Sequence, residues 1–212
     1  MSREGLDGMI PGPAILMVAV LLYISGFFLD ASGMPPPYGF LNGNMVVHFS
    51  SFPGFREQFI DYLGATAFWI FVSNITQVLV FIFTLATTIQ VLKVIVLSGA
   101  LLHNLVSTWG FRGFLIYAGT VHLHLEVMGC IFSLQAARVF IASILESISR
   151  GSAEPLIGAI KERLLFLIVL IAIIFAMAAI IEVFWSTWWV YIFTERQVSW
   201  TYFHSHVASV EL

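Results

Sequence analysis

Long runs of apolar residues, separated by short polar segments, cover most of the chain. A helix that crosses a bilayer needs about 20 mostly apolar residues, because each residue advances about 1.5 Å through about 30 Å of hydrocarbon. Runs of about this length lie at 13–29, 64–85, 89–106, 114–144 and 164–190. The pattern therefore predicts an all-α membrane protein, a single transmembrane domain of about five transmembrane helices.

The first apolar run follows Arg3, an arrangement that cleaved signal peptides and uncleaved first helices share. The run is long for a signal peptide, and the small residues at 31–33 match a cleavage site poorly. We expect an uncleaved first helix, with cleavage as the alternative.

Residues 30–63 are polar and rich in glycine and proline, and three consecutive prolines at 35–37 prevent a helix from continuing. We expect an external loop. Near its end, Phe55, Phe59 and Leu63 share one helical face, which is typical of a short helix lying in the membrane interface. An amphipathic lead-in to the next span is the alternative.

The remaining connections differ in length and charge. Only about three residues, 86–88, join the second and third spans, which predicts a tight antiparallel hairpin. A charged connection at 146–163 follows the fourth span. The last span carries no charge from Leu164 to Ile181 and ends in aromatic residues typical of an interfacial belt, before a polar tail at 191–212. These aromatic residues are Trp185, Trp188, Trp189 and Tyr191.

Composition supports the bilayer as the main solvent and excludes several function classes. The chain is 59% hydrophobic and 10% charged, against about 25% charged for a soluble domain. The formal net charge is −3, and the nine basic residues are scattered, so no basic stripe favours nucleic acid. Cys130 is the single cysteine, so no intrachain disulfide can form. No motif implies a cofactor.

The distribution of basic residues predicts the orientation. One side of the predicted membrane collects five cations and the other three, and an excess of Lys and Arg marks the cytoplasmic side. We expect a multi-pass protein of the cell membrane with its N-terminus cytoplasmic and its C-terminus outside. The five are Arg3, Lys93, Arg150, Lys161 and Arg163, and the three are Arg56, Arg112 and Arg196.

Two acidic residues, Glu126 and Glu182, fall inside predicted spans, where an ionisable group costs about 2.5 to 3.5 kcal/mol on insertion scales. His122 lies four residues before Glu126, on the same helical face. Depth along the spans places these and other polar residues in the outer half of the membrane, which predicts one shared polar site. Its members are His122, Glu126, Glu182, Asn74, Gln77, Ser98, Gly99 and His103.

Three roles for this site stay open. The residues could hold helices together by hydrogen bonds, handle an ion or proton, or ligate a metal. A His and one or two Glu at scattered positions specify no metal, so none is predicted. Along the same face as Glu126, the small residues Gly129, Ser133 and Ala137 predict a helix-packing seam.

No catalytic motif occurs in the chain. No serine lies in a G-x-S-x-G elbow, no H-E-x-x-H helix is present, and neither Asp30 nor Asp61 lies in a span, so no aspartate pair could hydrolyse a bond within the membrane. We expect a protein that is not an enzyme.

Several short motifs together resemble the stage II sporulation protein M family, in order and spacing, over about 64–184. They are His122 to Glu126 followed by Gly129, Ala136 and Ala137 for the H-x-x-x-E-L element, Ile181 to Phe184 for the I-E-A-F signature, Phe71 and Asn74 for F-x-x-N, and Ser98-Gly99 for N-G. The resemblance implies a five-helix membrane fold without known catalysis. In sporulating bacteria it implies work beside peptidoglycan-cleaving partners during engulfment.

The leading hypothesis is a non-enzymatic membrane scaffold or accessory component, working as a homo-oligomer or with partner membrane proteins. A second hypothesis is an ion or small-solute channel or transporter that uses His122, Glu126 and Glu182. A third is an accessory subunit of a respiratory or other membrane enzyme complex.

Overall fold

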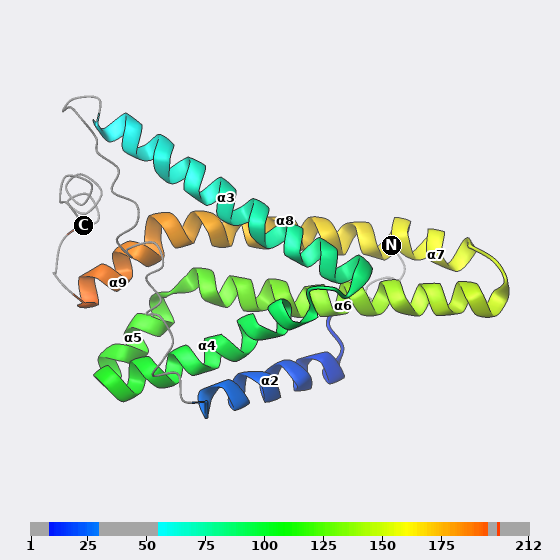
Figure 1. Cartoon of the computed structure of the whole chain (residues 1–212), viewed down its shortest axis with the longest axis horizontal. Coiled ribbons are helices and arrows are strands. Elements are labelled where there is room, and N and C mark those ends of the chain that lie inside the picture. The colour runs from blue at the N-terminus through cyan, green and yellow to red at the C-terminus, as the bar shows by residue number, and fades with distance from the viewer. Residues whose placement is uncertain (1–8, 30–54, 195–198, 200–212) are drawn as a thin grey trace.

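The computed structural model describes residues 9–29, 55–194 and 199, and every regular element in these ranges is helical (Figure 1). The all-α prediction is confirmed. The elements are α2 (Pro13–Phe27), α3 (Phe55–Thr84), α4 (Thr88–Trp109), α5 (Phe111–Gly119), α6 (Val121–Arg150), α7 (Glu154–Ala159), the π-helix η1 (Ile160–Leu164), α8 (Leu165–Ile181), the π-helix η2 (Glu182–Ser186) and α9 (Thr187–Thr194).

Four of the helical segments are long and apolar enough to cross a membrane: Leu63–Thr84, Thr88–Trp109, Val121–Arg150 and the continuous Glu154–Thr194. The first predicted span, 13–29, is a shorter apolar helix, α2, of 15 residues. At 1.5 Å per residue α2 is about 22 Å long, less than the hydrocarbon thickness.

Large apolar side chains point outward over much of the surface. On α8, Leu165, Val169 and Ile173 are each at least half exposed, and on α2 Met17 and Leu21 are more than half exposed. Such surface is unfavourable in water and matches lipid tails. The helices therefore suit a multi-pass membrane protein.

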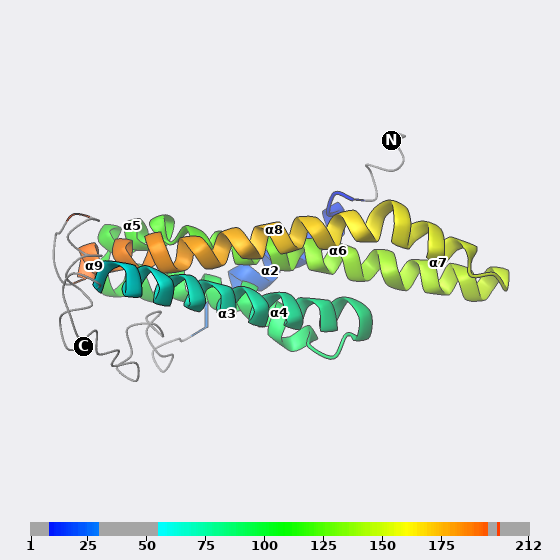
Figure 2. The ribbon, with the colours of Figure 1, turned by 90° about the horizontal axis from the view of Figure 1, so that it is seen from above.

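The long helix α6 lies at the centre of the bundle and packs against α8, α3 and α4 (Figure 1). Figure 2 shows the α3 and α4 helices on one side of the α6 and α8 pair. Ile95 of α4, Ala136 of α6 and Leu167 of α8 are fully buried where these helices meet. The helix α2 packs mainly along α4, and its Ala19 reaches the same core.

The predicted hairpin of the second and third spans is tight only at its turn. Thr87 donates its hydroxyl to the Gln77 carbonyl at 2.6 Å, which folds the turn back onto α3. Beyond it the two helices diverge, α3 along α8 and α4 along α2 (Figure 1). The predicted tight antiparallel hairpin is therefore limited to the turn, because α3 packs mainly against α8 and α4 mainly against α2.

The predicted fourth span, 114–144, is also wrong in its start: it is two helices, α5 and α6, broken at Thr120. The break is supported from far along the chain. Trp185 and Trp189 donate their indole N–H groups to the carbonyls of Gly119 and Leu115, both at 3.0 Å. A Cβ on Gly119 would lie 2.0 Å from the Trp189 ring, so glycine is required there.

The predicted connection at 146–163 is mostly helix. α6 continues to Arg150, Gly151 ends it in the left-handed conformation (φ 61°), and α7 begins at Glu154. The end of α6 and the start of α7 therefore form a helical hairpin that projects beyond the other helices (Figure 1).

The helix predicted near Leu63 is continuous with the second span, because α3 begins at Phe55 and runs without a break to Thr84. This is the lead-in alternative. The rest of the predicted external loop, at 30–54, and the tail residues 195–198 and 200–212 lie outside the described residues.

Candidate functional site

A hydrogen bond between two helices forms the centre of the candidate site. The Asn74 amide on α3 donates to Oε1 of Glu126 on α6 at 2.9 Å. Both side chains are half-buried. A carboxylate that accepts from an amide in a low-dielectric setting makes a stronger bond than a pair of neutral groups. This contact joins two of the helices that carry predicted polar residues.

A small cavity of about 50 Å³ surrounds this bond, in the space between the diverging α3 and α4. This volume is enough for one or a few water molecules, since about one probe sphere of space holds a water. The cavity is lined by Asn74, Gln77, Val78, Gln90, Val91, Val94, Glu126, Cys130 and Phe175. Three predicted site residues, Asn74, Gln77 and Glu126, thus meet in one place.

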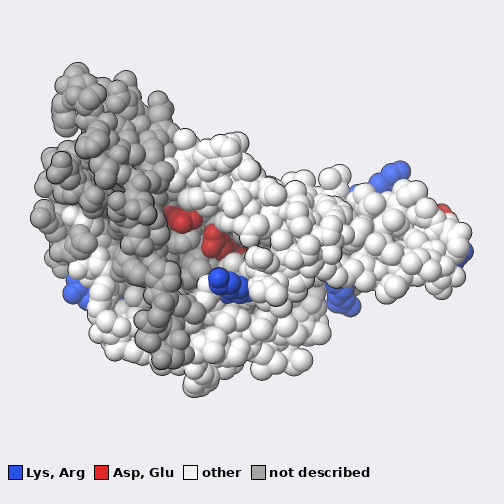
Figure 3. Space-filling model, viewed as in Figure 1, with Lys and Arg blue, Asp and Glu red and all other residues white. Residues whose placement is uncertain are grey.

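Glu182 lies close enough to Glu126 for the two carboxyl groups to interact electrostatically. Figure 3 shows acidic side chains near the middle of a largely uncharged face, next to a basic side chain. Among the residues whose side chains are described, 9–29 and 63–194, Glu126 and Glu182 are the acidic residues outside the end formed by α6, α7 and η1. Within those side chains the one ion pair joins Arg150 to Glu146, so neither carboxyl is paired with a base there.

Glu182 begins the π-helix η2, and its carbonyl accepts from both the backbone N–H and the hydroxyl of Thr187, the latter at 2.9 Å. π-Bulges within α-helices occur frequently at functional sites, because the extra residue changes which side chains face a neighbour. The wide turn therefore sets the direction in which Glu182 leaves the helix axis.

The other polar residues of α4 lie elsewhere. Ser98 is buried and hydrogen-bonds Tyr117 at 2.8 Å, and Tyr23 donates to the same Tyr117 hydroxyl at 2.8 Å. Gly99 packs against α2, where a Cβ would lie 2.0 Å from the Tyr23 carbonyl oxygen. His103 stacks edge-on against Phe27, with ring centroids 5.0 Å apart. These three residues belong to the contact of α4 with α2 and α5.

His122 is placed on α6 one turn before Glu126, but no hydrogen bond joins them within the described residues. Its Nδ1 is buried without a partner there. His124 instead lies against Tyr117, with Nε2 at 3.2 Å from that residue's carbonyl oxygen. Among the described residues, no three His, Cys, Asp or Glu side chains are grouped to hold a metal.

The predicted packing seam lies inside the bundle. Gly129, Ser133 and Ala137 are all buried, and a Cβ on Gly129 would lie 2.8 Å from the Phe175 ring of α8. The seam thus packs α6 against α8 of the same chain.

Sequence reasoning did not select Gln90, Tyr23 or Tyr117. Gln90 stands close to the start of α4, where an amide is usually taken as an interfacial residue. Tyr23 and Tyr117 lie in apolar helices, and a tyrosine there reads as a packing residue until its hydroxyl partner is known.

No family model, curated protein or solved structure matches the chain. The resemblance to the stage II sporulation protein M family therefore rests on the sequence motifs and stays a prediction.

Proposed function

We propose that the protein is a membrane transporter or channel component that binds a proton or a small monovalent cation at Glu126 and Glu182. The observation that supports the proposal is two acidic side chains, Glu126 and Glu182, close together in membrane-spanning segments (Figure 3), with no ion pair to a base among the described side chains. Two charged carboxylates without ion pairs in membrane-spanning segments would cost much free energy, so a proton or a bound cation must neutralise at least one.

The surroundings of Glu126 suit a cation. Asn74 uses its amide nitrogen on Glu126, which leaves its carbonyl oxygen for another ligand. Gln77 and Gln90 also line this cavity, so their side-chain amides are available to supply oxygen atoms, which are the ligands that hard cations prefer. The space of about 50 Å³ fits a small ion or water and excludes a larger solute.

Flux measurements on the full chain in liposomes test this function. We expect the wild-type protein to dissipate a proton or a sodium gradient, and Glu126→Gln or Glu182→Gln to slow that flux by about tenfold or more, because each removes the charge that attracts the ion. Glu162→Gln is the matched control, since Glu162 is exposed in η1 and should leave flux unchanged. Wild-type flux equal to that of empty liposomes, or flux that survives both substitutions, would exclude the proposal.

A second candidate, a scaffold or accessory component of a larger complex, is supported by the projecting hairpin. Leu145 and Ile148 near the end of α6 are 62% and 72% exposed, and Ile157 on α7 is 48% exposed. Apolar side chains on a charged projection suit a docking contact. The packing seam does not support an oligomer in the same way, because α8 of the same chain occupies it.

Mass measurement in mild detergent tests this second candidate. We expect the wild-type protein to run with a partner or a second copy, and Leu145→Glu with Ile148→Glu to release a folded monomer, because charges would disfavour the apolar contact. Glu154→Gln is the control, because Glu154 is an exposed residue of α7. Val169→Glu is unsuitable, because Val169 lies on the apolar outer face of α8. A wild-type protein that is already a lone monomer would contradict the candidate.

We also infer that the projecting end is cytoplasmic. Of the basic residues whose side chains are described, Arg138, Arg150, Lys161 and Arg163 lie on the C-terminal half of α6 and on η1, whereas Lys93 lies on α4 and Arg112 near the start of α5. An excess of Lys and Arg favours the cytoplasmic side.

A further inference from the structure

A second and larger cavity, of about 490 Å³, lies between the C-terminal half of α6 and the hairpin partner formed by α7 and η1. It is far along α6 from Glu126 and shares no lining residue with the small cavity there. Its walls carry three arginines and three glutamates: Arg138, Arg150, Arg163, Glu146, Glu154 and Glu162. The function proposed above uses none of them.

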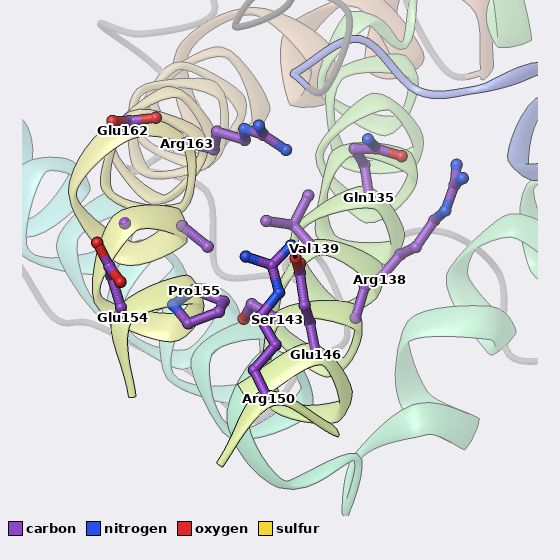
Figure 4. Close-up of a pocket in the computed structure, with 13 residues that line it drawn as sticks. Gln135, Arg138, Val139, Ser143, Glu146, Arg150, Glu154, Pro155, Glu162 and Arg163 are labelled. Atoms are coloured by element: carbon purple, nitrogen blue, oxygen red, sulfur yellow. Dashed lines mark ion pairs between the residues drawn. The ribbon is translucent and has the colours of Figure 1, made fainter. Parts of the chain in front are cut away.

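The charges on these walls are not equally available. Arg150 and Glu146 form an ion pair one helical turn apart and neutralise each other. Figure 4 shows the Arg163 side chain extending across the cavity toward α6, whereas the carboxyl groups of Glu154 and Glu162 lie on the outer side of their helix. Arg138 also lines the cavity, but its side chain extends to the side of α6 that faces away from α7 (Figure 4). Among the described side chains Arg163 makes no ion pair, so it is the guanidinium that extends into the cavity without a counter-charge.

Arg163 stands at the boundary between charged and apolar surface. It is half-buried near the end of η1, directly after Lys161 and Glu162. Two and three residues further along the helix, Leu165 and Phe166 are 59% and 49% exposed and begin the outward apolar face of α8. In a membrane this boundary is the level of lipid headgroups, with acyl chains alongside α8.

We propose that this cavity binds the phosphate group of an anionic membrane phospholipid, with Arg163 as its anchor. A guanidinium presents two parallel N–H donors that match two oxygens of a phosphate. One unpaired guanidinium balances the single charge of a phosphodiester, and the apolar face beginning at Leu165 receives the acyl chains. Basic pockets between helices on the cytoplasmic side are known to hold such headgroups.

Native mass spectrometry of the full chain, with phosphatidylglycerol or phosphatidylcholine added to detergent micelles, tests the proposal. We expect one tightly retained phosphatidylglycerol and much weaker retention of phosphatidylcholine, whose choline cancels the phosphate charge. Arg163→Gln should weaken phosphatidylglycerol retention by about tenfold or more, because it removes charge-assisted hydrogen bonds. Arg163→Lys should give an intermediate loss, since lysine keeps the charge but not the paired donors.

Lys161→Gln is the matched control. It removes one positive charge two residues away, from an exposed side chain that does not line the cavity. If Lys161→Gln weakens retention as much as Arg163→Gln, the attraction is a general surface effect and the proposal is wrong. Equal retention of the two lipids would also overturn it.

A third arm separates a lipid from a soluble phosphate compound. Inorganic phosphate should compete poorly, because it has no acyl chains to place on α8. If it displaces phosphatidylglycerol at low millimolar concentration, the lipid assignment is wrong. Should Arg163→Gln fail to fold, Arg163→Lys and Lys161→Gln still decide the question, since equal retention by these two variants and the wild type would contradict a role for Arg163.

Discussion

Replacing Gly99 with alanine is expected to separate α4 from α2 and to lower the stability of the protein strongly. A Cβ at this position would lie 2.0 Å from the Tyr23 carbonyl oxygen and 3.0 Å from the Phe27 nitrogen. Both are backbone atoms of a helix, so neither can move aside like a flexible side chain. Overpacking of this kind costs about 3 kcal/mol or more.

The contact is close from both sides. On α2, a Cβ on Gly26 would lie 1.9 Å from the Val96 carbonyl oxygen. Small residues that let helix backbones touch are the main packing device between membrane helices, where lipid tails remove the hydrophobic driving force. Gly26→Ala should therefore lower the stability of the protein by about as much as we expect for Gly99→Ala.

Thermal unfolding in detergent measures the effect, with Gly64→Ala as the matched control. Gly64 lies within α3, and nothing stands within 4 Å of a Cβ added there. Its replacement should be neutral or stabilise by up to about 1 kcal/mol, because alanine favours helix over glycine. If Gly99→Ala melts at the same temperature as Gly64→Ala, the close approach of α2 and α4 does not exist in the folded protein.

The outcome for Gly99 shows what depth along a span can and cannot predict. The sequence placed Asn74, Ser98, Gly99 and His103 at similar depth as Glu126, and Asn74 does bind Glu126. Ser98, Gly99 and His103 face α2 and α5 instead, whereas Val91 and Val94 of the same helix line the cavity. Depth follows from counting residues, but the rotation of a helix about its axis depends on its neighbours.

The fold was predictable to the extent that it depends on local apolar runs. Each long run is helical, the fourth as two helices, since a bilayer leaves backbone groups no other partner. The break at Thr120 was not predictable, because the groups that support it, Trp185 and Trp189, stand 66 and 74 residues from their carbonyl partners. The sequence predicted the group of tryptophans at the end of the last span, but it did not indicate which backbone carbonyls they bind.

The two acids at the centre of the candidate site were predictable as a pair, because the cost of a charge in hydrocarbon favours a shared site. The cavity with Arg163 was not, since the sequence placed a charged connection where the structure has two helices facing each other. The reversal between them depends on Gly151, which ends α6 in the left-handed conformation before α7 begins at Glu154.

Removing the Asn74 amide alone is expected to destabilise the protein more than removing Asn74 and Glu126 together. Asn74→Leu leaves the Glu126 carboxyl half-buried without its donor. An unsatisfied acceptor costs about 1 to 3 kcal/mol, and hydrogen bonds between membrane helices fall in the lower part of this range. We expect a loss of about 1.5 kcal/mol for Asn74→Leu.

The double variant Asn74→Leu with Glu126→Leu removes both polar partners and the repulsion between Glu126 and Glu182. Replacing both members of a buried pair by apolar groups is nearly neutral, so we expect unfolding close to that of the wild type. A double-mutant cycle of melting temperatures in one detergent gives the coupling between the two residues. Gln77→Leu is the control, because Gln77 lines the same cavity but bonds Ser73 and not Glu126. If the stability losses of the two single variants add up to that of the double variant, the 2.9 Å hydrogen bond contributes nothing to stability and Glu126 depends on another partner.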